Sequence, residues 1–260
     1  MRIICLGTTG FMPSDTAQTA CYLLPEVGVL LDAGSGLYHL PEYLQTHELD
    51  IYLSHAHADH TSGLEYLFAS FVAWNIRTSS QSLSEESIGG FVRAANASVR
   101  KTRIHADEAT LAVVQPKCHE LPFKWCVLQT HESLPNNGRL THFIMERNTI
   151  GYRLDWPGHS MAYITDTVAR PTAPYVERLS GVDVLLHDCH GPDALSGLME
   201  RIGHGHPLAV AQVAARAQVK RLIMIHHSPF EELDYSADLE RARQIFPSIE
   251  VGYDGMEIDF

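Results

Sequence analysis

The sequence predicts an α/β fold in which two β-sheets pack face to face with helices on their outer sides. Short apolar runs bounded by Gly, Pro, Ser and Asp recur in both halves of the chain, as expected for strands. Each group of strands is followed by helical segments, so that sheet and helix alternate twice. The 260 residues, 45% of them apolar, can form one sizeable core without a repeat or linker. We therefore expect a single domain over residues 1–260.

The first half of the chain opens with a predicted strand meander and then alternates helix and strand. The expected strands are Ile3–Leu6, Ala20–Leu24, Val27–Leu31 and Ile51–Leu53. A helix is expected at Leu37–Gln45, after the turn at Asp32–Gly36. A second helix is expected at Ser62–Phe71, because its apolar residues recur every three or four positions.

Residues 74–110 give a weak pattern, in which only Phe91–Val99 is expected to be helical. Strands then resume at Trp125–Leu128, Leu140–Met145, Thr149–Leu154, Ser160–Ile164 and Val182–Leu186. Pro207 suits the first position of an Ala-rich helix that ends near Ala217. The remaining elements are expected to be the strand Arg221–Ile225, the helix Ser236–Ile245 and, from the Asp254–Gly255 turn onward, the strand Gly255–Asp259.

Composition and charge disfavour several classes of protein. The 19 basic and 31 acidic residues give a formal charge of -12, which disfavours a general nucleic-acid-binding surface. No apolar run approaches the ~18 residues that cross a bilayer. Residues 1–11 lack the pattern of a signal peptide, so we expect a cytoplasmic protein without membrane contact. The five cysteines are scattered and form no C-x-x-C pair, so any metal must be held by histidine and carboxylate.

A cluster of metal-binding residue types follows the strand Ile51–Leu53. It comprises His55, His57, Asp59 and His60. A structural role is disfavoured, because clustered imidazoles repel one another when protonated and gain nothing in an apolar core when neutral. A single ion cannot use all four ligands and keep a position open for substrate, so the cluster predicts two ions with further ligands from elsewhere.

Three residues at other strand ends are candidates for these further ligands: His142, Asp166 and His226. For His142 alone, an ordinary strand histidine is an equal alternative. Nitrogen and oxygen ligands without thiolate suit zinc, with manganese or iron as alternatives. Asp32 is expected to accept a hydrogen bond from a motif histidine, or else to serve only the turn before Gly34.

These motifs resemble those of the metallo-β-lactamase superfamily and, within it, the phosphodiesterase branch that contains ribonuclease Z and phosphoribosyl cyclic phosphate phosphodiesterase. The matching stretches are Leu6–Gly10, Leu30–Gly34, His55–His60, His142, Ile164–Thr167, His226–Ser228 and Gly252–Ile258. The resemblance implies a four-layer αββα sandwich of the metallo-β-lactamase type and a homodimer. It further implies that His55, His57 and His142 hold one ion, that Asp59, His60 and His226 hold the other, and that Asp166 bridges the two.

The resemblance also implies that His204 is a functional histidine outside the metal ligands. His204 precedes the Ala-rich helix, whose N-terminus favours an anion, so its imidazole would face a bound phosphate and protonate the leaving oxygen. A capping or surface role is the alternative, and for His206 capping is the preferred interpretation. His187, Asp188 and His190 are expected to lie beyond the metal ligands or at the surface.

The expected activity is hydrolysis of a phosphodiester bond by a dinuclear metal centre. Two ions bridged by Asp166 would lower the pKa of a shared water, whose hydroxide attacks phosphorus, while Asp59 would accept a proton. The net charge favours a small or cyclic phosphodiester as substrate over RNA. The alternative is a tRNA 3′-processing endoribonuclease.

Two further alternatives stay open. The basic run Arg93, Arg100, Lys101 and Arg103 is interpreted first as a solvated helix face and second as a contact for phosphate or RNA. A non-hydrolytic metal-binding partner or cofactor-pathway protein is least expected, because such a protein would lack a metal ligand, whereas the sequence offers all seven.

Overall fold

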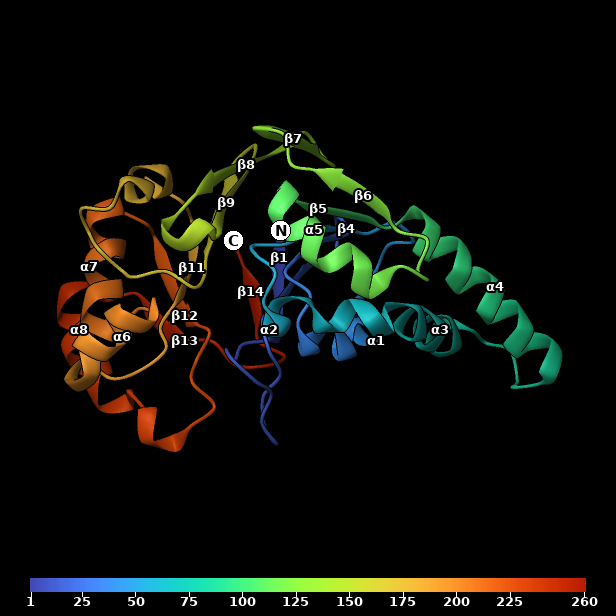
Figure 1. The fold of residues 1–260 in the computed structure, drawn as a ribbon, viewed down its shortest axis with the longest axis horizontal. Helices are drawn as coiled ribbons and strands as arrows, with labels where there is room; N and C mark the ends of the chain where they lie inside the picture. The colour runs from blue at the N-terminus through green and yellow to red at the C-terminus, as the bar shows by residue number, and fades with distance from the viewer.

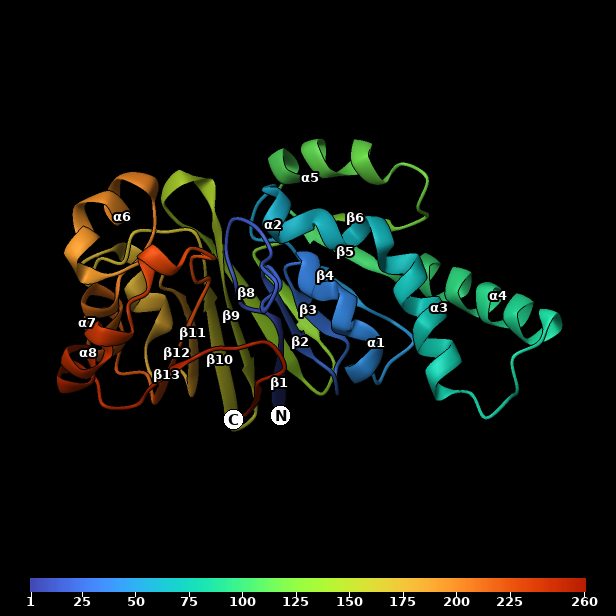
Figure 2. The same cartoon turned by 90° about the horizontal axis from the view of Figure 1, so that it is seen from below.

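The computed structural model describes residues 1–260 and has four layers: two β-sheets lie face to face, and helices cover the outer side of each (Figures 1 and 2). Each sheet has seven strands. The first has the order β14-β1-β2-β3-β4-β5-β6, and the second has the order β13-β12-β11-β10-β9-β8-β7. This architecture confirms the predicted αββα sandwich.

The first sheet is antiparallel at one side and parallel at the other. Its strands are β1 (Arg2–Gly7), β2 (Cys21–Leu24), β3 (Val29–Leu31), β4 (Asp50–Tyr52), β5 (Arg103–Ala106), β6 (Lys124–Val127) and β14 (Glu257–Asp259). β14, β1, β2 and β3 pair antiparallel, whereas β3, β4, β5 and β6 pair parallel. The pairing of β1 with β14 brings the two chain ends side by side (Figure 2).

The second sheet has the same mixed character. Its strands are β7 (His131–Leu134), β8 (Gly138–Ile144), β9 (Ile150–Trp156), β10 (His159–Ile164), β11 (Val184–Asp188), β12 (Arg221–Ile225) and β13 (Ile249–Val251). β7 to β10 form an antiparallel meander, and β10 to β13 pair parallel.

Alternating side chains on the strands build three apolar layers, because successive residues of a strand point to opposite faces of the sheet. On β1, Ile3 and Cys5 face the second sheet and join the core between the sheets, together with Tyr163 of β10. Ile4 and Leu6 of β1 face outward under the first group of helices. A third cluster, which includes Ile164 of β10, lies outside the second sheet.

Helices cover both outer faces. The first sheet is covered by α1 (Leu40–Tyr43), α2 (Ala58–Thr61), α3 (Leu67–Thr78), α4 (Glu85–Lys101) and α5 (Glu108–Val114). The second is covered by α6 (Ser196–Ile202), α7 (Pro207–Ala217) and α8 (Leu239–Ile245). The α3 and α4 helices project together as an arm (Figures 1 and 2). None of the helices combines the length and apolar character that crossing a membrane requires.

Several helices differ from the predicted boundaries. One helix was expected at Leu37–Gln45, but the structure has a 3-10 turn at Ser35–His39 followed by α1. The α1 helix ends at Tyr43, because the backbone of Leu44 is extended. Ser62–Tyr66 is likewise 3-10, and α3 starts only after it.

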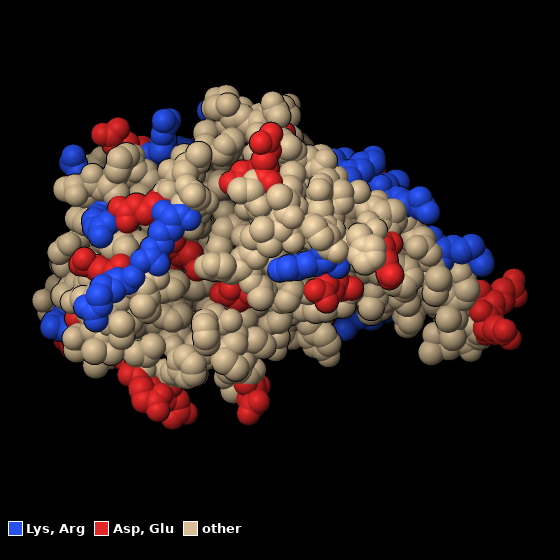
Figure 3. Space-filling model, viewed as in Figure 1, with Lys and Arg blue, Asp and Glu red and all other residues tan.

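The weakly patterned residues 74–110 contain most of the arm. Ser84 caps α4 by accepting a hydrogen bond from the backbone N–H of Ser87, so the helix starts well before the predicted Phe91. The basic run is divided: Arg100 and Lys101 end α4, where cations complement the helix dipole, and Arg103 lies on β5, where it pairs with Asp50. Figure 3 shows basic side chains along this edge of the molecule and acidic ones at the arm's tip.

Candidate metal centre and active-site pocket

The candidate site lies where strands from both sheets end at the same edge of the sandwich. β3 ends just before Asp32, and β4 leads into the histidine motif. In the second sheet, β10 ends shortly before Asp166 and β12 ends at the residue before His226. Asp32, Asp166 and His226 have φ angles of 56°, 46° and 61°. Residues other than glycine rarely adopt this left-handed region, and such strain clusters at functional sites.

A pocket of about 760 Å³ opens over these strand ends. Its metal-binding and titratable lining consists of His55, His57, Asp59, Asp166, His190, His204 and His226. Apolar side chains also line it, namely Phe11, Ala58, Ile202, Phe230 and Leu233. Arg147 is the only Lys or Arg in the lining. The pocket thus combines imidazoles, carboxylates, an apolar part and one fixed cation.

Four predicted ligands form a compact group, which we call the inner set: Asp59, His60, Asp166 and His226. Nε2 of His60 lies 3.2 Å from Nε2 of His226, and each of these atoms lies 3.4 Å from Oδ2 of Asp59. Oδ1 of Asp166 lies 3.0 Å from Nε2 of His60 and 3.2 Å from Nε2 of His226. A tetrahedral zinc ion with bonds of about 2.0–2.1 Å separates its ligands by about 3.3–3.4 Å. The two imidazoles and the Asp59 carboxylate therefore have the spacing of ligands to one divalent ion, and Oδ1 of Asp166 lies within 3.2 Å of both imidazoles.

The remaining predicted ligands near the pocket form a looser group, the outer set: His55, His57 and the second oxygen of Asp166. Nε2 of His55 lies 2.8 Å from Nδ1 of His57 and 3.6 Å from Oδ2 of Asp166. Nδ1 of His57 lies 4.0 Å from the same oxygen, and the His57 side chain is 73% exposed. These three atoms can contribute to a second ion, and Asp166 reaches both sets.

The structure does not bring His142 to either set. This residue lies on β8 opposite Tyr152 of β9, and its Nδ1 is 3.0 Å from the backbone oxygen of Gln129. It is also absent from the pocket lining. Six of the seven predicted ligands therefore gather at one place, and the ligand role of His142 has no geometric support.

Asp32 is the hydrogen-bond acceptor beneath the inner set. Its fully buried carboxylate accepts from Nδ1 of His60 at 2.6 Å, and from the backbone N–H and Oγ of Ser54 at 2.6 and 2.7 Å. The hydroxyl of Tyr163 donates to it at 2.6 Å. Because Nδ1 of His60 carries the donated proton, Nε2 is left as the ligand atom. The predicted hydrogen bond between Asp32 and a motif histidine is confirmed.

Charges of opposite sign stabilise one another within the metal-free cluster. Burial disfavours the charged form of His226, but Asp166 and Asp59 together raise its pKa to about 9. Burial likewise opposes ionisation of Asp166, whereas His226 and His60 hold the pKa of its carboxyl well below the usual range. Burial lowers the pKa of His55 to about 4, so His55 is neutral at pH 7. Metal binding must therefore displace protons from the inner set but not from His55.

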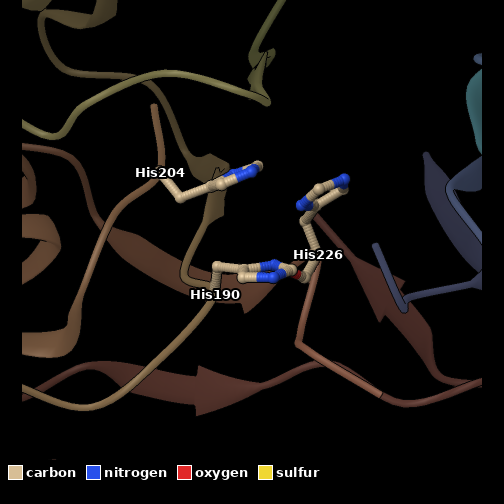
Figure 4. A group of neighbouring side chains, drawn as sticks. All are labelled: His190, His204 and His226. Atoms are coloured by element: carbon tan, nitrogen blue, oxygen red, sulfur yellow. The ribbon is translucent and has the colours of Figure 1, made fainter. Parts of the chain in front are cut away.

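His204 stacks on His190 beside the inner set, and both rings lie close to His226 (Figure 4). Nδ1 of His204 lies 2.7 Å from Oδ2 of Asp188, so that Nδ1–H donates to a carboxylate and Nε2 is left for the pocket. Nδ1 of His190 lies 3.0 Å from the backbone oxygen of His226, which can only accept. Burial lowers the pKa of His190 to about 4. The two stacked imidazoles thus differ in their partners: Nδ1–H of His204 donates to a carboxylate, whereas Nδ1–H of His190 donates to a backbone oxygen.

The other flanking residues are divided between core and pocket surroundings. His187 is fully buried and contacts the hydroxyl of Tyr175 at 3.1 Å, away from the pocket. His206 occupies the N-cap position of α7, but its side chain makes no cap hydrogen bond. Instead, Asp193 accepts from Nδ1 of His206 and from the backbone N–H of Leu208.

Two pocket residues had no signal in the sequence. Arg147, in the loop between β8 and β9, donates to the backbone oxygens of Ile202 at 2.8 Å and Arg201 at 2.6 Å, at the end of α6. The backbone N–H of Phe11 donates to Oδ2 of Asp59 at 2.7 Å and so orients an inner-set carboxylate. Both are single residues in loops, where no periodic pattern marks a role.

The chain matches the family model of the β-lactamase superfamily domain over residues 28–227, and it therefore belongs to this superfamily. Within it the chain is similar to proteins of the phosphodiesterase branch, and its clusters of His and Asp could hold a divalent ion. It is 28% identical to a ribonuclease Z of Saccharolobus solfataricus over 281 aligned positions, which cover 95% of each chain.

Solved structures share the fold at low sequence identity. The metallo-β-lactamase fold protein YhfI of Bacillus subtilis superposes with a TM-score of 0.77 at 17% identity, covering 99% of both chains. A diphosphatase of the PhnP family superposes with a TM-score of 0.68 at 17% identity, covering 100% of this chain and 97% of that one.

Proposed function

We propose that the protein hydrolyses a phosphodiester bond in a small or cyclic phosphodiester. The observation that carries this proposal is the inner set of four ligands, three of which line a pocket whose lining also includes a carboxylate-backed histidine. When bound, divalent ions would supply an activated water and positive charge against the phosphoryl oxygens. Metal ligands and a proton donor at one pocket are the groups that phosphodiester hydrolysis requires.

The residues divide this work between binding and proton transfer. Asp59, His60, Asp166 and His226 would hold the first ion, and His55 and His57 would contribute to a second. His204 would donate a proton from Nε2 to the leaving oxygen, while Asp188 holds the ring in the required orientation through Nδ1. Asp59 serves better as a ligand than as a base: burial opposes its ionisation, but the charge of His60 holds its carboxyl pKa well below the usual range.

The pocket and the net charge both favour a small substrate. Arg147 is the only Lys or Arg in the lining, and two backbone oxygens hold its guanidinium in place. The formal charge of -12 means that the protein repels a polyanion unless it offers that polyanion a basic surface. A single phosphodiester meets one cation here, whereas a long RNA would have to cross a mostly acidic molecule.

A second candidate is tRNA 3′ processing, supported by the ribonuclease Z of Saccharolobus solfataricus, which aligns over nearly its whole length. The activity in that name is the activity of the relative. In this chain, RNA would have to contact the arm formed by α3 and α4, on which Arg93 and Arg100 are exposed.

A substrate panel separates the two candidates. The zinc-loaded protein would be assayed with bis(p-nitrophenyl) phosphate, 2′,3′-cyclic nucleotides, a cyclic ribose phosphate and a precursor tRNA. We expect turnover of at least one small diester and little cleavage of the precursor. Cleavage at the tRNA 3′ end with a higher kcat/KM than any small diester would replace the first candidate by the second. An Arg93→Glu, Arg100→Glu variant is the control, because it should impair only the tRNA reaction.

A further inference from the structure

The inner and outer sets differ in completeness. In the inner set, Nε2 of His60 and Nε2 of His226 lie 3.2 Å apart, and each lies within 3.0–3.4 Å of an oxygen of Asp59 and of an oxygen of Asp166, the range expected around one ion. The outer set has three atoms, separated by 2.8, 3.6 and 4.0 Å, so its spacing is irregular as well as one ligand short. The two halves of the centre are therefore unequal in number and in regularity of ligands.

Burial adds to the difference. His60 and His226 have side chains that are 0% and 1% exposed, and Asp59 and Asp166 are 9% and 13% exposed. Nδ1–H of His60 is held by Asp32, and Oδ2 of Asp59 is held by the N–H of Phe11. In the outer set, His57 is 73% exposed, and its only side-chain hydrogen-bonding contact is with His55. Ligands fixed in advance bind an ion with less loss of side-chain entropy than mobile ones.

No further imidazole can complete the outer set from the neighbouring hairpin. His142, the only histidine of β8 and β9, is engaged with the oxygen of Gln129. The loop between these strands instead brings Arg147 and Thr149 to the pocket. A guanidinium does not bind a metal cation, so Arg147, which donates to the backbone oxygens of Ile202 and Arg201, cannot complete the outer set.

We propose that the protein holds one resident divalent ion in the inner set, and that the outer set binds a second ion only weakly. This inference rests on the proposed metal centre but not on any substrate. His142 is then a structural residue of the hairpin, and Arg147 is a cation of the pocket lining that does not bind a metal. We expect the inner set to bind its ion roughly 100-fold more tightly than the outer set. Loss of a residue that only hydrogen-bonds to a metal ligand already lowers metal affinity roughly 10–100-fold, and the outer set lacks a ligand itself.

The test is metal binding without substrate. Chelator-treated protein would be dialysed against buffers of graded free Zn²⁺, and the bound zinc per chain measured by mass spectrometry of the metal. We expect a first equivalent at low free zinc and a second only at about 100-fold higher concentration. His57→Ala should weaken only the second equivalent, and His142→Ala should change neither.

Variants of the inner set complete the experiment. Asp59→Asn and His226→Ala should each lose the first equivalent of zinc. Circular dichroism checks that both variants are folded, and Asp59→Asn is expected to disturb folding less because Asp59 is less buried than His226. Two equivalents of equal affinity, or loss of one equivalent in His142→Ala, would overturn the inference while leaving the metal centre intact. No retained zinc at all would overturn the inference and the proposed function together.

Discussion

At the residue scale, one buried carboxylate organises the site. Asp32 accepts from His60, Ser54 and Tyr163 and has no exposed surface, so an amide in its place would direct a donor at other donors. We expect Asp32→Asn to lower the free energy of unfolding by about 2–3 kcal/mol, because at least one buried donor is left unpaired. Urea unfolding of the metal-free protein measures this loss.

Tyr163→Phe is the graded control for this prediction, because it removes a single donor to Asp32 and should cost only about 1 kcal/mol. A stability of Asp32→Asn within about 0.5 kcal/mol of the wild type would show that the buried carboxylate does not organise the site.

His204 provides the second prediction at this scale. His204→Ala should retain its metal content but lose roughly 100-fold or more in kcat, with the largest loss for poor leaving groups, because it removes the proton donor. His206→Ala is the matched control, since His206 lies two residues away and pairs with Asp193. Steady-state kinetics on aryl and alkyl phosphodiesters measures both variants. Full activity of His204→Ala on an alkyl diester would show that His204 is not the acid.

At the element scale, α7 shows how a helix fills the layer outside the second sheet. Ala211 and Ala214 are fully buried against β11 and β12, where only small side chains fit between helix and sheet. Ala214→Leu should therefore destabilise the protein by about 1–3 kcal/mol through overpacking. Gln212→Leu, on the exposed face of the same helix, should change stability by less than about 0.5 kcal/mol. Equal effects of the two substitutions in urea unfolding would contradict this packing.

Elements with strong local patterns could be predicted from the sequence, and short ones could not. α7 begins at Pro207 and ends at Ala217 as expected, because a first-position proline and an apolar face define it. β5, β7 and β13 were not predicted: each has only three or four residues and owes its pairing to partners distant in sequence. α4 was predicted too short, because its first turns are polar and depend on the Ser84 cap.

In the candidate site too, residues in a local pattern could be predicted from the sequence, whereas residues placed by tertiary packing could not. Spacing identified the motif residues, whereas Asp166 and His226 were predicted from their places at strand ends and from the family resemblance. The same reasoning included His142, whose place depends on how the β8–β9 hairpin is oriented, and it missed Arg147 for the same reason. Hairpin orientation depends on tertiary packing and cannot be inferred from a single histidine.

At the scale of the whole molecule, the charge balance of the metal-free centre makes stability depend on pH. The folded-state pKa of His226 is raised from 6.5 to about 9, despite its burial, by Asp166 and Asp59. A raised pKa stabilises the folded protein below the unfolded value, and this contribution is lost as pH rises through the folded value. Chelator-treated protein should therefore lose roughly 2–3 kcal/mol between pH 6.5 and pH 9.

Zinc-loaded protein should not show this loss, because the ion replaces the proton on His226, and the zinc-induced rise in Tm should grow over the same pH range. Thermal unfolding of both forms at several pH values measures the difference. A constant difference in Tm between the two forms would contradict the placement of His226 in the metal centre.

We propose that metal held at these strand ends performs the hydrolysis. The most direct test of this role is turnover of bis(p-nitrophenyl) phosphate by wild-type and Asp166→Ala protein, each before chelation, after chelation and after zinc is restored. We predict that wild-type turnover disappears on chelation and returns with zinc, whereas Asp166→Ala, which loses the carboxylate shared by both sets, stays inactive throughout. Wild-type turnover that survives complete removal of metal would contradict this role of the metal.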